Sequence, residues 1–187
     1  MRTFEALPDG HVLGGFTPLE SELLNDLATQ VVELLDGQLP HDRLLATVGI
    51  ATTDVATNGI ASAGIGGSDG PSSDPAIARL LPNAYLDDEH ASQEFRYFTE
   101  HSLVSRKITN ARIFTLTLDG GGEVNLGPEA QQAWLRTLAD IRLIIASRLG
   151  IENDGDEGRA DSDDEIMMND VYEWLAVVQG SLVDALD

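Results

Sequence analysis

Four side chains between residues 90 and 101 have the types and spacing of a metal site on a helix. His90, Glu94, Tyr97 and His101 follow one another at intervals of four, three and four residues, which places them on one helical face. Imidazole nitrogens and carboxylate oxygens are common zinc ligands. The two histidines, however, are separated by about 16 Å along a straight helix. A solvated helix face is the better interpretation, and we predict no metal site and no cofactor.

Two other segments resemble ligand-binding loops. Residues 64–70 are glycine-rich, but they lack the lysine of a P-loop and the flanking strand and helix. The acidic residues 152–158 suggest a calcium loop, yet an EF-hand register that places Gly158 at its required position puts Gly155 where an oxygen ligand is needed. We expect a flexible loop in the first case and a solvated acidic linker in the second, with weak cation binding at most.

Two arginines, Arg142 and Arg148, lie in a strongly apolar helical segment. A guanidinium in such a place must be paired or must extend to water. Asp140 and Glu173 are available partners in principle. Structural ion pairs are a better interpretation than an anion-binding site, because buried charges are usually paired. No nucleophile and base stand at a spacing that indicates a catalytic centre, and we predict no catalytic residues.

The charge of the chain restricts its partners. Its 187 residues include 32 acidic and 11 basic side chains, which give a net charge of −21, and Lys107 is the only lysine. Such a field repels nucleic-acid phosphates and anionic membrane surfaces. No apolar run approaches the roughly 20 residues that span a bilayer. We therefore expect a cytoplasmic protein without direct nucleic-acid or membrane contact.

The chain contains no cysteine. This excludes disulfides, thiolate nucleophiles, thiolate metal sites and thiol-based switches within it. The fold must therefore rest on packing.

Helical spacing of apolar residues and capping signals predict most of the secondary structure. Thr17-Pro18-Leu19-Glu20 is a capping box that starts a helix ending at Asp36-Gly37. Further helices are expected over about 41–48, from Asp74-Pro75 to Pro82, from Gly127-Pro128 to Gly150, and over 167–186. Another helical segment is expected to begin at Asp87 or Asp88. We expect a kink or a break in it near Thr99, which favours two helices over one.

The segment 113–126 allows two interpretations. Phe114, Leu116 and Leu118 alternate with polar residues, and so do Val124 and Leu126, which is typical of a β-hairpin. A two-stranded ribbon alone is marginally stable, and the preceding helical stripe continues to Thr115. We favour a helix, a loop and one short extended segment.

These elements predict an all-α (mainly α) fold. The expected architecture is a single helical domain over 1–187, a bundle of about six helices, with the apolar helix 128–149 at its centre. Residues 51–73 and 152–165 are expected to be mobile, because they lack apolar anchors and carry small residues or dense like charge.

Several motifs together resemble a known family. They are Gly66 to Asp88, Trp134-Leu135-Arg136 through Arg142-Leu143, Ser147 to Ile151 and Tyr172-Glu173-Trp174-Leu175. In these motifs the chain is similar to an actinobacterial family of unknown function with AosR-like oxidative stress regulators. The resemblance implies a transcriptional role through contact with the transcription machinery in response to oxidants. Because this chain has no cysteine, it cannot act as a thiol-based oxidant sensor. Met167 and Met168 are poor substitutes for cysteine, since their oxidation is slower and they lie on a helix that we expect to face the core.

The resemblance favours a protein-binding regulator or adaptor linked to transcription or stress response. A structural homo-oligomeric protein is the alternative, and an enzyme has the least support. The candidate partner-binding residues are Tyr85, Asp88, Arg142 and Arg148. The partner would be a protein with a basic or apolar surface, such as a component of the transcription machinery, and a homodimer is a further option.

Overall fold

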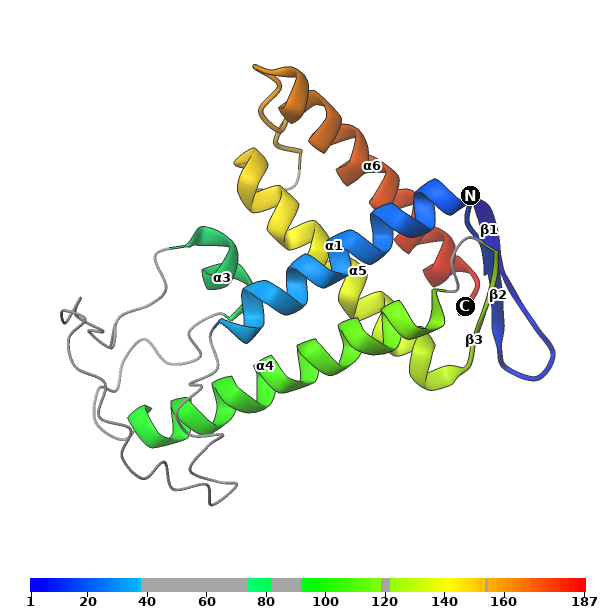
Figure 1. The fold of residues 1–187 in the computed structure, drawn as a ribbon, viewed down its shortest axis with the longest axis horizontal. Coiled ribbons are helices and arrows are strands. Elements are labelled where there is room, and N and C mark those ends of the chain that lie inside the picture. The colour runs from blue at the N-terminus through cyan, green and yellow to red at the C-terminus, as the bar shows by residue number, and fades with distance from the viewer. Residues whose placement is uncertain (38–73, 82–91, 119–121, 154) are drawn as a thin grey trace, which may run out of the picture.

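The computed structural model describes residues 1–37, 74–81, 92–118, 122–153 and 155–187, with side chains in the helix that starts at Ser92 described from residue 101. The helices in these ranges are α1 (Pro18–Asp36), α3 (Pro75–Leu80), α4 (Ser92–Thr117), α5 (Pro128–Leu149) and α6 (Asp163–Asp184); the strands are β1 (Arg2–Ala6), β2 (Val12–Gly15) and β3 (Glu123–Leu126) (Figure 1).

The predicted capping box at the start of α1 is confirmed. The Thr17 hydroxyl accepts a hydrogen bond from the Glu20 N–H at 3.3 Å, and the Glu20 carboxylate accepts one from the Thr17 N–H at 2.8 Å. Together they satisfy donors that the first helical turn leaves unpaired. The helix ends at Asp36, directly before Gly37, as predicted.

Other helix ends also follow local signals. The Asp74 carboxylate accepts a hydrogen bond from the Ala76 N–H at 2.9 Å and caps α3. Gly150 ends α5 in the left-handed region, with φ of 73°, a conformation that glycine adopts without strain. Ser162 caps α6, so the last residues of the predicted acidic linker form the first turn of this helix.

Helix α4 corrects the prediction of a break near Thr99. It runs without interruption from Ser92 to Thr117. The physical reason is that these residues contain neither proline nor glycine, so nothing in the backbone breaks the helix. The apolar stripe can rotate around a continuous helix when successive turns pack against different neighbouring elements. The predicted helix at 41–48, the loop at 51–73 and the cap at Asp87 or Asp88 lie outside the described residues.

A three-stranded antiparallel sheet corrects the all-α prediction to a mainly helical fold. The strand order is β1-β2-β3, with Glu5 opposite Leu13 and Gly14 opposite Val124. The short extended segment favoured near 113–126 is confirmed as β3, whereas a hairpin within 113–126 is wrong because residues up to Thr117 are helical. The partner of β3 comes from the N-terminal part of the chain.

The β1–β2 hairpin was missed, although its turn has a recognisable signal. Pro8-Asp9-Gly10 is a turn sequence in which proline presets one dihedral and glycine permits positive φ. Gly10 has φ of 84°, and the Leu7 N–H donates to the His11 carbonyl at 2.8 Å. The flanking strands are short, and β2 ends in two glycines, so the alternation of apolar and polar residues that would indicate strands is weak.

Four aromatic side chains join the sheet to the helices. The ring of Trp134 lies 4.1 Å from that of Phe114, 5.7 Å from that of Phe16 and 5.8 Å from that of Phe4, between centroids. The Trp134 indole N–H donates to the Thr117 hydroxyl at 2.7 Å, so its one polar group is satisfied. Trp134 is fully buried and belongs to the core.

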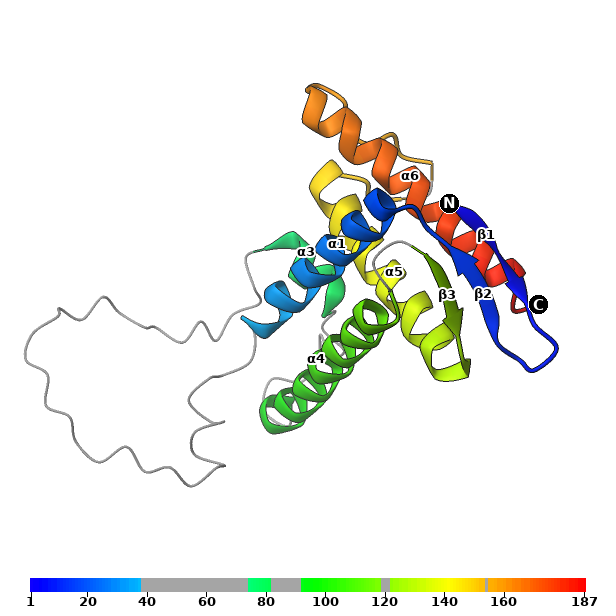
Figure 2. The ribbon, with the colours of Figure 1, turned by 45° about the vertical axis from the view of Figure 1, so that its right-hand side comes forward.

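Helix α5 is the central element, as predicted. It contacts α1, α3, α4, α6 and β3. The sheet lies at one end of the helices, and the last helix, α6, packs on α5 and on β1 (Figures 1 and 2). Residues from both ends of the described chain therefore lie side by side, and the Phe4 N–H donates to the Ser181 hydroxyl at 2.8 Å.

Candidate functional site

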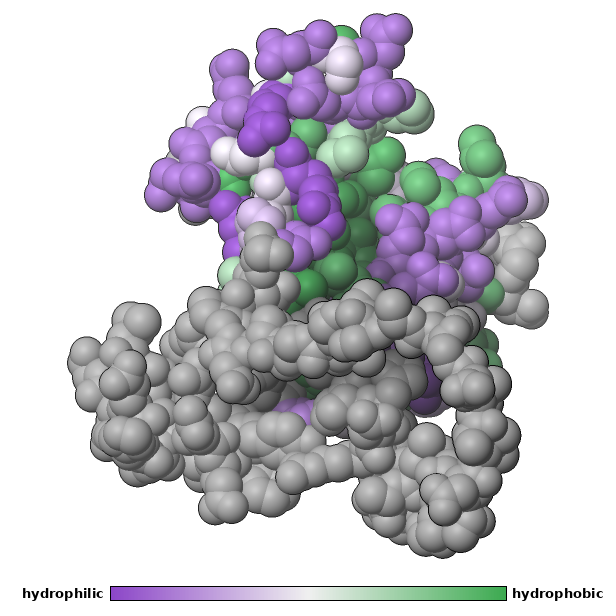
Figure 3. All heavy atoms as spheres, turned by 60° about the vertical axis from the view of Figure 1, so that its left-hand side comes forward, coloured by the Kyte–Doolittle hydropathy of each residue, from purple (hydrophilic) through white to green (hydrophobic). Residues whose placement is uncertain are grey.

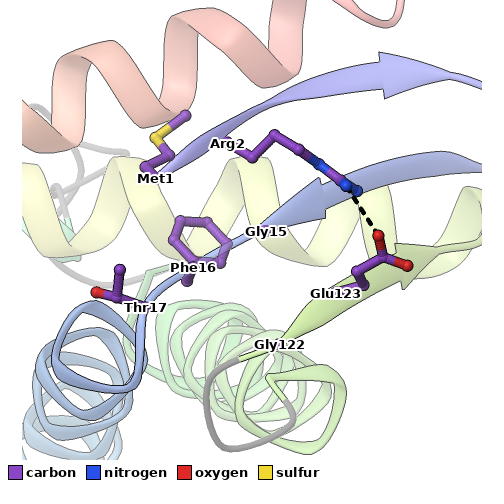
Figure 4. A pocket seen from close by; sticks show the side chains of 7 residues that line it. All are labelled: Met1, Arg2, Gly15, Phe16, Thr17, Gly122 and Glu123. Atoms are coloured by element: carbon purple, nitrogen blue, oxygen red, sulfur yellow. Dashed lines mark hydrogen bonds and ion pairs between the residues drawn. The ribbon is translucent and has the colours of Figure 1, made fainter.

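A small hollow lies where β1, β2 and the start of α1 meet. Its volume is about 270 Å³, and Figure 4 shows Arg2 reaching across to Glu123, with the guanidinium 2.8 Å from the carboxylate. The hollow is lined by Met1, Arg2, Gly15, Phe16, Thr17, Gly122 and Glu123. It contains no nucleophile except the Thr17 hydroxyl, which donates to the Glu20 carboxylate as part of the helix cap.

The Glu20 carboxylate beside this hollow has a lowered pKa. Burial by itself raises that pKa, but hydrogen bonds from the Met1 ammonium, at 2.7 Å, and from Thr17 outweigh it. The group therefore contributes stability that is present above its ordinary pKa and is lost as the pH falls. These interactions give Glu20 a structural role at the start of α1.

A larger hollow, which we call the β1–α6 pocket, has a volume of about 720 Å³. It lies between the outer edge of β1 and the C-terminal half of α6. Its lining comprises Thr3, Phe4, Glu5, Ala6, Val177, Gly180, Ser181, Asp184, Ala185 and Asp187. No lysine, arginine or histidine is among them, so the pocket is acidic, and the Ser181 hydroxyl in its lining accepts a hydrogen bond from the Phe4 N–H.

The arginines predicted to bind a partner occupy different environments. Arg148 is about half-exposed, and its guanidinium lies 2.9 Å from the Asp74 carboxylate, which links the end of α5 to the start of α3. Arg142 donates to the Gln179 side chain at 2.9 Å and stacks 4.9 Å above the Tyr172 ring, which links α5 to α6. Tyr85 and Asp88, the other two predicted residues, lie outside the described part of the chain.

The acidic partner suggested for these arginines is engaged elsewhere. The Asp140 carboxylate pairs with the Lys107 ammonium between α5 and α4, at 2.5 Å, and the two side chains are 6 % and 17 % exposed. Burial raises the pKa of Asp140, and the nearby ammonium offsets only part of that rise. Sequence spacing did not reveal this pair, because its members are 33 positions apart. The sequence does contain a signal for it, namely the one lysine of the chain and an aspartate within an apolar helix.

The acidic segment before α6 is organised by its own hydrogen bonds. The Asp156 carboxylate accepts from the N–H groups of Glu152 and Asn153 at 3.0 and 2.7 Å, which lowers its pKa. The Asn169 amide donates to the Arg159 carbonyl at 2.7 Å and ties the segment to α6. Within the described residues no group of three or more His, Asp or Glu side chains could hold a metal ion.

Apolar side chains also reach the surface. Figure 3 shows an apolar stretch of surface between two hydrophilic areas. The exposed large apolar residues of the described chain are Leu19, Leu116, Leu143, Ile166, Met167, Val177, Val183 and Leu186. Met167 is 60 % exposed, which corrects the expectation that it faces the core; Met168 is partly buried against the core. None of the described helices is both long and apolar enough to cross a membrane.

Sequence comparison identifies relatives along almost the whole chain. A family model described as Domain of unknown function (DUF2017) matches residues 1–186. The chain is 28 % identical over 183 residues to proteins named "Oxidative stress regulator AosR" from Mycobacterium bovis and from two strains of Mycobacterium tuberculosis. The alignment covers 89 % of this chain and 78 % of each relative. No solved structure matches the chain.

Proposed function

The chain belongs to the DUF2017 family, and from this membership we propose that it is a regulator in the response to oxidative stress that acts by binding a protein partner. The observation that carries the proposal is the similarity to proteins named oxidative stress regulators over 89 % of the chain. These relatives are named as regulators, and we propose accordingly that the chain is not an enzyme.

The charge of the chain supports action through a protein. A net charge of −21 opposes binding to the phosphate backbone of nucleic acids, whose affinity for proteins depends on lysine and arginine contacts. A component of the transcription machinery with a basic or apolar surface is therefore the proposed partner. Electrostatic attraction would accelerate its association, and added salt would weaken it.

The absence of cysteine supports a role in transmitting a signal. Thiol oxidation cannot occur in this chain, so we propose that the oxidant is sensed elsewhere and that this protein responds through its partner. The methionines offer a slower chemistry, in which the thioether becomes a polar sulfoxide.

Among the residues that the structure describes, Arg148 is the strongest candidate for partner contact on the helical side of the molecule. Its guanidinium is half-exposed and holds one carboxylate, that of Asp74, so several of its donors are free to bind other acceptors. Tyr85 and Asp88 remain proposed contact residues, and Arg142 is proposed to support this face through its contact with α6.

A complementation experiment tests the proposed regulation. Cells that lack the gene should lose survival and transcript induction after hydrogen peroxide, and the intact gene should restore both. Purified tagged protein should retain a component of the transcription machinery from lysate, less at high salt than at low salt. Equal survival and equal induction in both strains would refute the stress role, and sequence-selective duplex DNA binding by the pure protein would refute action through a protein alone.

A pair of arginine variants tests the proposed contact. Arg148→Gln should weaken partner retention, whereas Arg136→Gln, an exposed residue on the same helix about 18 Å away along its axis, should not. The two variants change the net charge equally. An equal loss of retention in both would indicate a general effect of charge and would remove Arg148 from the proposed contact.

A further inference from the structure

The β1–α6 pocket is an open acidic and apolar hollow that the fold does not fill. Val177, which lines the pocket from α6, is 63 % exposed. One exposed valine is ordinary on a protein surface; the charge of the pocket and its strand edge are what point to an occupant. Figures 1 and 2 show the C-terminal end of α6 lying beside β1, so the pocket has one helical wall and one strand wall.

Gly180 opens the helical wall of this pocket. It lies inside α6, where its φ is not in the left-handed region that favours glycine, and a Cβ atom built on it would meet nothing within 4 Å. Neither backbone conformation nor packing within the described chain therefore requires glycine here, although glycine weakens a helix interior. Glycine does permit a bound chain to approach the helix backbone closely.

The charge of the pocket indicates the chemistry of its occupant. The carboxylates of Glu5, Asp184 and Asp187 have no hydrogen-bond or ion-pair partner among the described residues. Like charges brought together at one hollow repel one another and favour a cation between them. A guanidinium or ammonium on an aliphatic stem would place its charge near Glu5 and Asp184 and its stem against Val177.

The strand wall favours an extended occupant. β1 is an edge strand, and Leu7 donates its N–H toward β2, to the His11 carbonyl. Backbone groups alternate in direction along a strand, so the N–H and carbonyl of Ala6 point away from β2. The Ser181 hydroxyl already accepts the Phe4 N–H on this outer side, so Ala6, beyond Phe4, is where the edge offers backbone groups to another chain. An added chain could pair with such an edge.

We infer that the β1–α6 pocket docks a basic, extended segment of the protein partner. This inference rests on the proposed function and adds the chemistry of the partner to it. The segment pairs with the outer edge of β1 at Ala6, beyond the Phe4–Ser181 hydrogen bond, and crosses α6 at Gly180. Its cationic side chains bind Glu5 and Asp184, and an aliphatic side chain contacts Val177.

A labelled peptide tests the docking directly. The test peptide is a fluorescein-labelled octapeptide of alternating arginine and valine, and the references carry glutamine or glutamate in place of arginine. We expect fluorescence anisotropy to show binding of the arginine peptide that is at least about tenfold tighter than that of the glutamine peptide at low salt. Amide NMR shifts should concentrate at Thr3–Ala6 and Val177–Ala185. Equal binding of the arginine and glutamine peptides, or shifts spread over the whole surface, would overturn the proposal.

Variants separate the pocket from the general charge of the protein. Gly180→Trp should fill the pocket and reduce affinity at least about tenfold, whereas Gly180→Ala should change it by less than about threefold. Glu5→Lys with Asp184→Lys should reduce affinity by more than Asp26→Lys with Glu33→Lys, a control pair on the exposed face of α1 that changes the net charge equally. Equal losses in the two pairs would overturn a specific site.

Complementation distinguishes failure of the docking from failure of the proposed function. If the intact gene restores oxidant survival and Gly180→Trp does so equally, the stress role stands and the docking inference is overturned. If deletion of the gene has no effect on survival, the proposed function fails independently of the peptide result. Circular dichroism of Gly180→Trp should match that of the parent, and the Glu5 and Asp184 variants provide the second test if it does not.

Discussion

Helices α5 and α6 have the same length and opposite roles. Each contains 22 residues, but α5 buries ten of them and α6 buries only Leu175, Val178 and Leu182. α5 is surrounded by four helices and β3, whereas α6 packs on α5 and β1. Burial of apolar area provides most folding stability. The difference shows that α5 holds the fold together, while α6 leaves most of one side available for contact.

The largest expected effect is at Trp134 on α5. Trp134→Ala should lower the free energy of unfolding by about 3–5 kcal/mol, because it removes a fully buried ring and leaves a cavity among three phenylalanines. Val177→Ala on α6 should change it by less than about 0.5 kcal/mol, since that side chain is 63 % exposed. Urea denaturation measures both. Losses of similar size would contradict the division between the two helices.

The buried ion pair of α5 should give the next largest effect. Asp140→Ala leaves Lys107 without its partner and should cost about 3 kcal/mol. Lys107→Met with Asp140→Leu should return stability to within about 1 kcal/mol of the parent, because hydrophobic replacement of a buried pair is often neutral. A double variant as unstable as Asp140→Ala would show that the pair itself stabilises the fold.

Loss of the α6 cap should have a smaller effect that is confined to α6. Ser162 accepts a hydrogen bond from the Glu165 N–H at 3.3 Å, and Ser162→Ala should cost about 1 kcal/mol. Hydrogen exchange should accelerate in the first turns of α6 and remain unchanged in α5. Faster exchange throughout α5 would mean that the two helices unfold as one unit and would weaken the comparison.

The smallest effect is a dependence on pH that has opposite signs at two carboxylates. The pKa of Asp140 is raised from 3.8 by burial, so the folded state retains this proton to higher pH than the unfolded state. Stability from this group falls as the pH rises above 3.8 toward the folded pKa. The pKa of Glu20 is lowered from 4.5, so its contribution falls as the pH drops below 4.5.

Urea titrations of Asp140→Asn and Glu20→Gln between pH 3 and 7 separate the two effects. The stability of the parent relative to Asp140→Asn should decrease as the pH rises, and relative to Glu20→Gln it should increase. Parallel curves for the parent and Asp140→Asn would show that the Lys107 ammonium fully compensates the burial of Asp140.

The features that the sequence predicted are those whose cause is local. The capping box at Thr17, the Asp74 cap and the Gly150 stop each depend on residues within one helical turn. The sheet depends on pairing of β2 with β3, such as Gly14 with Val124, which no local pattern records. The unbroken α4 was missed because a rotated apolar stripe was interpreted as a kink.

The site shows the same limit. Arg142 and Arg148 were chosen from their apolar helix, but their partners, Gln179 and Asp74, come from other elements. Sequence spacing cannot identify such partners, because tertiary packing brings them together. The β1–α6 pocket was missed entirely, since it joins residues such as Glu5 and Asp184 from opposite ends of the described chain.

The hydrogen bond from Phe4 to Ser181 joins residues 177 positions apart, and this has a consequence for synthesis on the ribosome. At about 5–20 residues per second, Ser181 follows Phe4 by roughly 10–35 seconds. Trp134 follows Phe4 by 130 positions, so for most of this interval the nascent chain cannot bury Phe4 and Phe16 against it. We therefore expect chaperones that bind emerging chains to recognise these apolar side chains.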